Sequence, residues 1–236
     1  MAYEVKSLRK AYGSRLVLDG LDLAFPEGKI TVVLGPSGCG KTSMLNILAG
    51  LDDAYSGTVS GFGRGKVSYV FQEDRLLPWM SATENVAFVL RQRLDSSRAH
   101  VVAEEALAAV GLSESAGARP GALSGGMRRR VALARAFAYP SEVLLLDEPF
   151  SSLDLKTRIS VMDLFVELRA KDGRSAVVVT HDVREAIYLG DRIVTLSDKP
   201  ARMRDAFDVR LDRDGRSYAS SAGAEFEARL YASILS

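Results

Sequence analysis

An eight-residue segment at positions 35–42, with the sequence Gly-Pro-Ser-Gly-Cys-Gly-Lys-Thr, constrains this chain more than any other feature. It fits the P-loop pattern, in which glycines allow backbone N–H groups to close around phosphate oxygens at the start of a helix. A β-rich run at 29–34 precedes the segment. After it, Met44, Leu45, Leu48 and Leu51 have the spacing of one helical face. The segment therefore predicts a strand, a phosphate-binding loop and a helix, in that order.

The side chains at the end of this loop suit the phosphates of a nucleotide. Lys41 would reach the β- and γ-phosphates, and the hydroxyl of Thr42 would bind Mg²⁺, which prefers hard oxygen ligands. Cys39, the single cysteine of the chain, suits a small filler. The predicted nucleotide-binding residues of this segment are Gly35, Pro36, Ser37, Gly38, Cys39, Gly40, Lys41, Thr42 and Ser43.

Two carboxylates follow a second apolar run. Positions 143–146 read Val-Leu-Leu-Leu and lead into Asp147 and Glu148. Ligands bind at the carboxyl ends of strands in open α/β sheets, so both side chains would lie near the P-loop. Asp147 would then hold the water shell of the magnesium ion, and Glu148 would polarise the attacking water as a general base. Without the P-loop, solvated acids after a buried strand would be an equally good interpretation.

Length and composition limit the number of domains and the kinds of partner. At 236 residues, the chain is long enough for one sizeable α/β domain, from 1 to 236, with an inserted subdomain. Apolar residues make up 47% and charged residues 26%, as in ordinary globular proteins. The net charge of +1 comes from 31 basic and 30 acidic residues mixed along the chain, which indicates no nucleic-acid partner.

The sequence also bears on where the protein works. No stretch approaches the roughly 18 consecutive apolar residues that a bilayer crossing requires. The chain begins Met-Ala-Tyr-Glu-Val and passes straight into a strand-like pattern, without the basic, apolar and small-residue regions of a secretory leader. A single cysteine cannot form an intrachain disulfide, which fits a reducing compartment. We therefore expect a cytoplasmic chain that does not itself cross a membrane.

Hydrophobic periodicity predicts two regions that differ from the α/β pattern. Apolar and polar residues alternate over 3–25, which is typical of half-buried antiparallel strands. From about 74 to 140 the pattern is helical instead, with Ser81 and Glu84 at the spacing of a capping box. We expect this second stretch to be an inserted helical subdomain.

The remaining elements alternate between strand and helix, which implies a mostly parallel, helix-covered sheet. Further strands are predicted at 58–59, 67–71, 143–146, 176–180 and 192–196, and helices at 155–170 and 183–189. A short C-terminal tail begins at about residue 211. It ends in a possible amphipathic helix with the apolar residues Phe226, Leu230, Tyr231 and Ile234.

A second glycine-rich helix start lies between the P-loop and the Asp147–Glu148 pair. Residues 123–127 read Leu-Ser-Gly-Gly-Met and precede a helical run, so Ser124 and two glycines would form another anion-binding helix N-terminus. In this order, the segment resembles the signature motif of ATP-binding cassette proteins. The resemblance extends to about residue 210. It implies a P-loop NTPase fold, with a RecA-like core, an antiparallel β subdomain and a helical subdomain, and an ATPase that uses ATP and Mg²⁺.

The resemblance implies that two copies of the chain pair head to tail, so that hydrolysis requires a dimer. Signature residues of one subunit would face the γ-phosphate held by the other subunit. These residues are Leu123, Ser124, Gly125, Gly126 and Met127. Met127 and Arg129 depart from the family pattern, in which glutamine is frequent at both positions.

Single residues also match family positions with roles in hydrolysis. Gln72 matches the Q-loop glutamine, which touches Mg²⁺ and the attacking water. His181 matches the switch histidine that contacts the γ-phosphate, and with Glu148 it completes the implied catalytic pair. The implied metal-binding residues are Thr42, Gln72 and Asp147.

Three weaker matches concern the adenine and the dimer contact. Tyr12 matches the aromatic residue that stacks on adenine, and Val17 matches the apolar residue beside it. Both positions would also suit the core or a surface strand. Asp154, in the sequence Ser-Ser-Leu-Asp, matches the D-loop.

A cassette that is not fused to membrane helices fits the importer arrangement. There, the subunit docks on a separate permease at the inner face of the cell membrane and works indirectly with a solute-binding protein. Leu76, Leu77 and Trp79 would form an apolar groove for a permease helix, or they belong to the core of the helical subdomain.

Two segments narrow the resemblance further. Residues 72–79 and 196–202 resemble those of the nitrate, sulfonate and taurine importer group, which implies uptake of a small sulfonate- or nitrate-like solute. Two alternatives share the same ATP site: a soluble cassette ATPase in assembly, such as iron–sulfur cluster assembly, and lipoprotein extraction. The partner of the chain distinguishes all three.

Overall fold

The computed structural model describes residues 3–235 and separates into two compact units. The first unit comprises Met1–Val67, Leu145–Glu148 and Arg174–Ser236, and the second comprises Ser68–Leu144 and Pro149–Gly173. None of the helices within 3–235 combines the length and the apolar character that a bilayer crossing needs.

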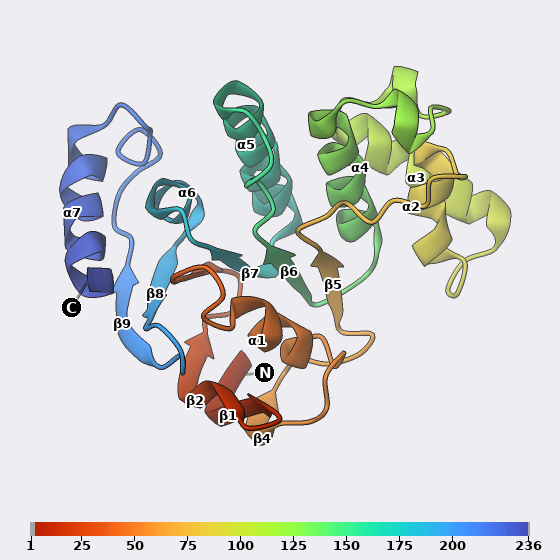
Figure 1. The fold of residues 1–236 in the computed structure, drawn as a ribbon. Coiled ribbons are helices and arrows are strands. Elements are labelled where there is room, and N and C mark those ends of the chain that lie inside the picture. Colours follow the sequence, from red (N-terminus) through yellow and green to blue (C-terminus); the bar gives the residue numbers. More distant parts are fainter. Residues whose placement is uncertain (1–2, 236) are drawn as a thin grey trace. The chain divides into compact units, whose positions relative to one another are not determined.

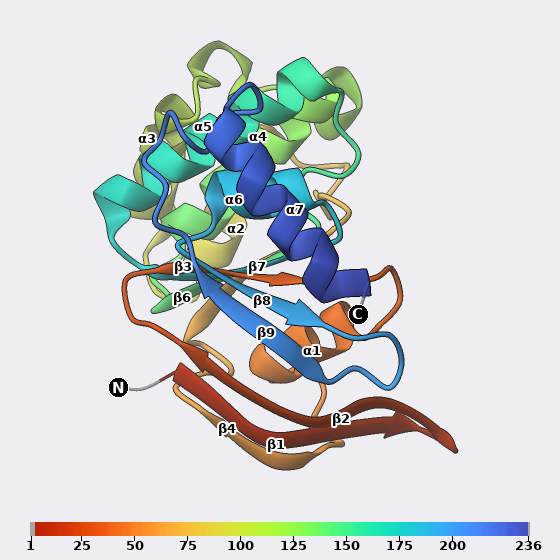
Figure 2. The ribbon, with the colours of Figure 1, turned by 90° about the vertical axis from the view of Figure 1, so that its left-hand side faces the viewer.

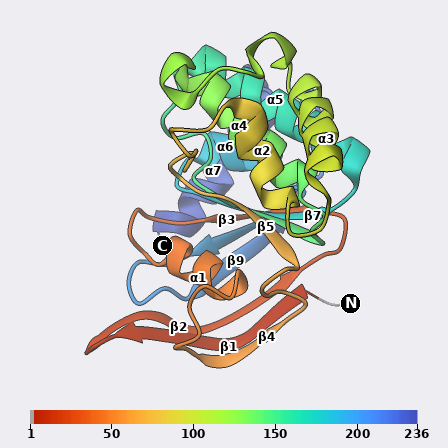
Figure 3. The ribbon, with the colours of Figure 1, turned by 90° about the vertical axis from the view of Figure 1, so that its right-hand side faces the viewer.

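The first unit contains a small antiparallel sheet, which confirms the strand prediction for the start of the chain. Its strands are β1 (Tyr3–Tyr12), β2 (Arg15–Phe25) and β4 (Ser56–Ser60), in the order β2-β1-β4 (Figure 3). Alternate residues are buried in the second half of β2: Leu21 and Leu23 lie in the core, whereas Asp22 between them is exposed. This period of two is what a sheet with one buried face requires.

A larger sheet carries the P-loop. Its centre is β3 (Ile30–Leu34), which pairs in parallel with β7 (Ser175–Thr180) and with β8 (Arg192–Leu196). The hydrogen-bonded strand order is β5-β6-β7-β3-β8-β9. The other strands are β5 (Val67–Val70), β6 (Val143–Asp147) and β9 (Met203–Asp208). The parallel order confirms the α/β prediction, and it brings the carboxyl ends of β3, β6 and β7 to one edge of the sheet.

Strand β9 was not predicted from the sequence. It pairs antiparallel with β8 at the edge of the sheet, with Phe207 opposite Ile193. No residue of β9 is fully buried, because an edge strand has only one neighbour. Only three of its six residues are apolar, and they do not alternate with polar ones, so the sequence lacks the pattern by which strands are recognised.

The described part of the first unit contains three helices: α1 (Lys41–Leu48), α6 (Val183–Leu189) and α7 (Ser221–Leu235). Helix α7 lies over β8 and β9 and beside α6 (Figure 2). Two helical predictions were wrong in detail. Leu51 lies beyond the end of α1 and is 58% exposed, since Gly50 leaves the helical conformation with φ +67°. Tyr231 is 47% exposed, so the buried face of α7 is carried by Phe226 and Leu230 instead.

The second unit is mainly helical. Its four helices are α2 (Ala82–Leu90), α3 (Ser96–Ala109), α4 (Gly125–Ala138) and α5 (Leu155–Asp172), and α2, α3 and α4 lie side by side in Figure 1. Two 3-10 turns, Ser113–Ser115 and Pro120–Ala122, lead from α3 to α4.

The start of α2 confirms the predicted capping box. The Ser81 hydroxyl accepts a hydrogen bond from the Glu84 N–H at 3.2 Å, and the Glu84 carboxylate accepts one from the Ser81 N–H at 2.7 Å. Each bond satisfies a backbone donor that the helix leaves unpaired. Leucines and alanines of α2, α3 and α4 then form the apolar core of this unit.

Candidate functional site

The P-loop joins β3 to α1 with its lysine turned back onto the loop. Lys41 is 4% exposed, and its ammonium donates to the carbonyl oxygens of Gly35 at 2.7 Å and Pro36 at 2.9 Å. The first N–H groups of α1 point out of the helix start, and Gly40 at the N-cap supplies no side chain to satisfy them. The result is a cluster of backbone donors beside a buried cation, which suits an anion of high charge.

Gly40 shows why this loop is rich in glycine. Its φ is +125°, a conformation that residues with side chains rarely adopt. A Cβ atom added there would lie 2.7 Å from Cδ2 of Leu18 and 2.8 Å from Cγ1 of Val17. The loop can therefore approach β2 this closely only because position 40 has no side chain.

The two carboxylates after β6 face the P-loop from the neighbouring strand end. Asp147 is 4% exposed, and one of its oxygens accepts a hydrogen bond from the Thr42 hydroxyl at 3.2 Å. Glu148 has a φ of +40°, which is uncommon for a residue with a side chain. Its backbone N–H donates to the Val179 carbonyl at 3.0 Å, so the bend is held by the adjacent strand.

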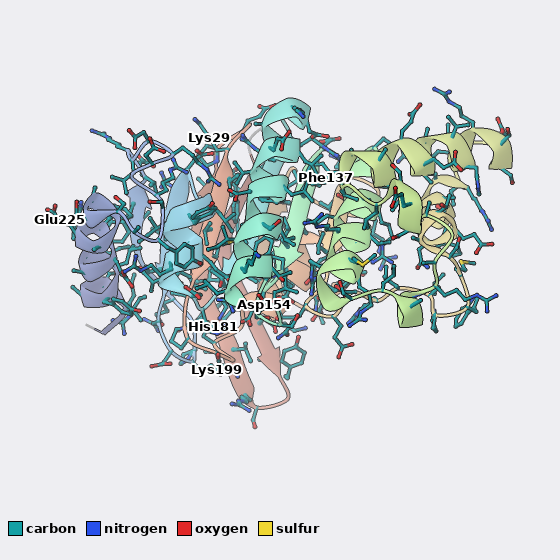
Figure 4. The ribbon with its side chains drawn as sticks, turned by 90° about the horizontal axis from the view of Figure 1, so that it is seen from above. Lys29, Phe137, Asp154, His181, Lys199 and Glu225 are labelled. Carbon is teal, nitrogen blue, oxygen red and sulfur yellow. The ribbon has the colours of Figure 1, made fainter. Side chains whose placement is uncertain are left out.

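Glu148 also connects two other predicted residues. One carboxylate oxygen lies 3.1 Å from Nδ1 of His181, and the other lies 3.8 Å from Nζ of Lys41. His181 directly follows Thr180, the last residue of β7, and is labelled near Lys199 in Figure 4. Three residues that are far apart in sequence are thus brought together, because their strands end at the same edge of the sheet.

A cavity of about 340 Å³ opens beside this cluster. Most of its lining consists of residues predicted to bind nucleotide, together with the predicted catalytic Glu148: Tyr12, Val17, Gly38, Gly40, Lys41, Thr42, Ser43 and Glu148. Arg15 and Lys199 also line it. Neither was identified from the sequence, and no motif or spacing could have indicated them, because only the folding of β2 and of the loop after β8 brings them here.

The mouth of the cavity carries an exposed aromatic ring. Tyr12 is 51% exposed, and its hydroxyl lies 3.2 Å from Oδ2 of Asp52 and 3.4 Å from the Ser43 hydroxyl. Nζ of Lys10 lies 4.6 Å from the centre of the ring. The same ammonium contacts Oδ1 of Asp52 at 2.6 Å, and this hydrogen bond is the main reason that the pKa of the Asp52 carboxyl is below its usual value.

Ser124 and Asp154 in the second unit are both helix caps. The Ser124 hydroxyl accepts from the Met127 N–H at 3.2 Å at the start of α4. The Asp154 carboxylate accepts from the Thr157 N–H at 3.1 Å at the start of α5, and hydrogen bonds to Thr157 lower its pKa. A Cβ on Gly126 would lie 2.6 Å from Cγ2 of Thr157, so the signature helix and α5 pack closely at this position.

Gln72 lies in the same unit, in an exposed loop whose backbone is hydrogen-bonded to an arginine of α4. Arg129 is 2% exposed and donates to the backbone carbonyls of Phe71 at 2.7 Å and Gln72 at 2.5 Å. Its Nε lies 3.1 Å from Oδ1 of Asp74. Burial raises the pKa of the Asp74 carboxyl and lowers that of Arg129, while each charge favours the other. The sequence marked Arg129 only as a departure from a pattern, without indicating this contact.

The remaining residues predicted from the sequence are either buried in the core or exposed at the surface. Cys39 is 1% exposed, and burial raises the pKa of its thiol, in agreement with a small filler. Leu123 is 4% exposed and belongs to the apolar core of the second unit. Residues 76–79 form the docking segment, which was predicted to offer an apolar groove to a permease helix. In this segment Leu76 packs against that same core, whereas Trp79 is 66% exposed.

Comparison with known proteins gives one consistent result. Residues 18–151 match the ABC transporter family. An aliphatic sulfonates import ATP-binding protein of Pseudomonas syringae pv. syringae is 42% identical over 215 residues, covering 90% of this chain and 89% of that protein. A protein with the same description from Pseudomonas aeruginosa is 43% identical over 222 residues, covering 89% and 88%.

Two solved structures of one ABC transporter cassette, MJ0796, are similar in fold. Its dimeric structure has a TM-score of 0.77 and 30% identity, and the match covers 90% of this chain and all of that one. A dimeric post-hydrolysis state bound to ADP and phosphate has a TM-score of 0.76 and 31% identity, with the same coverage.

Proposed function

Because the chain belongs to the ABC transporter family and is an ATPase of that family, we propose that it is the ATP-hydrolysing subunit of an importer for aliphatic sulfonates or related small anions. The observation that carries the ATPase chemistry is the contact of Glu148 with both His181 and the P-loop lysine. The importer and its solute class are supported by relatives that are 42–43% identical over most of the chain and are described as sulfonate import ATP-binding proteins.

In this proposal, ATP lies with its phosphates on the P-loop and its adenine toward Tyr12. The Lys41 ammonium exchanges the carbonyls of Gly35 and Pro36 for phosphate oxygens, and the N–H groups at the start of α1 donate to the same oxygens. The exchange replaces neutral acceptors with charged ones, and hydrogen bonds to charged groups are the stronger kind.

Hydrolysis then needs a base and a residue that orients it. A water oxygen attacks the γ-phosphorus, its proton passes to Glu148, and the bond from the γ-phosphorus to the bridging oxygen breaks to leave ADP. His181 Nδ1, 3.1 Å from the Glu148 carboxylate, orients that base and faces the γ-phosphate side of the site. The buried Lys41 offsets negative charge that develops on the leaving oxygen.

The residues beside the loop fit a magnesium ion. Thr42 and Asp147 present a hydroxyl and a carboxylate oxygen 3.2 Å apart, and magnesium is usually held by one or two such donors together with substrate phosphates. We propose that these two residues hold it. When bound, the ion would neutralise charge on the phosphates.

We also propose a head-to-tail dimer. Support comes from the dimeric MJ0796 cassettes, to which this chain is similar at 30–31% identity. Ser124 and Gly126, at the start of α4, then face the ATP of the other subunit, and Asp154 lies at the dimer contact. Mixing inactive Lys41→Ala and Ser124→Arg chains should restore some ATPase activity through one intact composite site. A mixture as inactive as its components would argue against this geometry.

The partner in the membrane is a separate permease at its inner face. Trp79, 66% exposed, is the residue through which we propose that the docking segment meets a permease helix. A solute-binding protein would take part indirectly. The alternatives in assembly or lipoprotein extraction receive no support from the relatives, which are described as import proteins.

One variant tests both the chemistry and the partner. Glu148→Gln should lower ATP turnover by about 10²- to 10⁴-fold, the usual contribution of a general base, while ATP binding persists. Glu167→Gln is the control, because this exposed glutamate pairs only with Lys171 on the surface of α5. Near-normal turnover in Glu148→Gln would refute the base assignment.

A tagged form of Glu148→Gln, purified from gently solubilised native membranes, should copurify with a stoichiometric amount of a permease that spans the membrane several times. When the unsubstituted chain is reconstituted with that permease, a solute-binding protein loaded with an alkanesulfonate should stimulate its ATPase activity. Stimulation by a different class of solute would retain the importer and replace the sulfonate, and recovery of soluble proteins alone would refute the importer.

A further inference from the structure

Lys199 is a second lysine at the P-loop cavity, and neither the motifs nor the proposed chemistry uses it. It lies in the loop after β8 and lines the same cavity as Gly38 and Lys41. Its Nζ atom is 3.7 Å from the position that a Cβ on Gly38 would occupy. Figure 4 shows Lys199 near the edge of the sheet where His181 follows β7, with Lys29 at the opposite edge.

The loop that carries Lys199 is anchored to β2. The Ala201 N–H donates to the Val17 carbonyl at 2.8 Å, and the Asp19 N–H donates to the Ala201 carbonyl at 3.0 Å. Ala201 itself is fully buried, and Arg202 forms an ion pair with Asp19. Two residues after Lys199, the loop is therefore tied to β2, whose Val17 also lines the cavity.

Lys199 differs from the other lysines near the cavity in how its charge is placed. Lys10 is paired with Asp52, and Lys41 donates to loop carbonyls. By contrast, the structure of residues 3–235 gives the Lys199 ammonium no hydrogen bond or ion pair. Many solvated lysines also lack a protein partner for their charge, but few of them lie within a few ångströms of a phosphate-binding loop.

We propose that Lys199 binds the phosphate chain of ATP, as a second lysine that approaches the P-loop from the side of Gly38. This role rests on the proposed ATP site. An ammonium on a flexible stem provides three donors and suits phosphate oxygens, which can be reached from several directions. Lys199 would therefore stabilise bound nucleotide, and it would do so for ATP and ADP but not for adenosine.

The test compares nucleotide affinities of purified full-length variants. Lys199→Met should raise the Kd for ATP and for ADP about 5- to 30-fold, which lies between the effects expected for a neutral hydrogen bond and for a strong charged one. Adenosine, measured by competition, should bind as before. Lys199→Arg should retain most of the affinity, since it keeps the charge. Lys29→Met, at the other edge of the sheet, should match the unsubstituted chain.

Each outcome decides something. An unchanged Kd for ATP in Lys199→Met overturns the proposal, and so does an equal rise in the Kd for adenosine, which would indicate a general disturbance of the site. A lowered melting temperature in Lys199→Met together with failure of Lys199→Arg to restore affinity would also overturn it in favour of a structural role. If the unsubstituted chain and Lys29→Met bind no ATP, the proposed function itself fails and the role of Lys199 with it.

Discussion

Arg129 offers the most demanding test of how the second unit is held together. This residue lies on α4, two positions after the signature segment, yet its guanidinium contacts the loop that carries Gln72. It makes two hydrogen bonds to backbone carbonyls and an ion pair with Asp74. Because its side chain is 2% exposed, no water replaces these contacts when they are lost. Replacing it removes three interactions at one buried point.

The expected cost follows from that burial. Removing one partner of a buried ion pair costs about 3–5 kcal/mol, since the other charge remains buried and unpaired. We expect Arg129→Gln to lower the free energy of unfolding by about 3 kcal/mol. The value is at the low end because Asp74 is 19% exposed and keeps its ion pair with Arg128 at 3.7 Å. The glutamine amide can also still donate to one carbonyl.

The assay is urea unfolding followed by circular dichroism, together with hydrogen exchange of the amides at 71–76. Arg128→Gln is the matched control: its side chain is 40% exposed, its Nε lies 3.7 Å from Asp74, and it donates a hydrogen bond to the Leu123 carbonyl at 2.7 Å. Its loss should therefore cost less, about 1–2 kcal/mol. Adding Asp74→Asn to Arg129→Gln should recover part of the stability, because the buried carboxylate that has lost its closest partner is then replaced by a neutral amide. The reasoning is refuted if Arg129→Gln costs no more than Arg128→Gln.

Three further predictions concern other elements. Lys10→Met should raise the pKa of Asp52, measured by a carbon NMR titration. In the unsubstituted chain the folded-state pKa of Asp52 is below the unfolded one, so the stability from this pair is present above the unfolded pKa and is lost as the pH falls through the folded pKa. The variant should therefore lose less stability below about pH 4. An unchanged Asp52 titration would contradict this. Gly40→Ala should cost about 2–4 kcal/mol in urea unfolding, because a side chain there meets Leu18 and the φ is strained, and a cost below about 1 kcal/mol would show that the loop relaxes. Ser81→Ala should cost about 1 kcal/mol by the same measurement, with no effect as the contrary result.

Local patterns explain why much of the fold was predictable from the sequence. The P-loop, the strand before Asp147 and the cap at Ser81 are each defined by neighbours within a few positions, and the backbone conformations they require are short-range. The alternation of strands and helices in turn predicts a parallel sheet, and the sheet implies which strand ends meet. The roles assigned to the site residues in hydrolysis remain predictions that rest on this arrangement.

Features that depend on surroundings were predicted less well. Leu51 and Tyr231 have apolar side chains at helical spacing, but the end of α1 and the packing of α7 leave them exposed. Strand β9 has little apolar character because it lies at an edge. In each case, periodicity reports the average preference of a side chain and not which neighbours it meets.

The site itself divides in the same way. Residue types at fixed spacing were enough to identify Lys41, Thr42 and Glu148, because a phosphate-binding loop and a strand-end carboxylate carry their chemistry in consecutive positions. Lys199 approaches Gly38 of the P-loop, 161 positions away in the chain. Arg129 donates to the carbonyl of Gln72, 57 positions away. No periodicity spans such separations, so these contacts exist only once the sheet and the helices have packed.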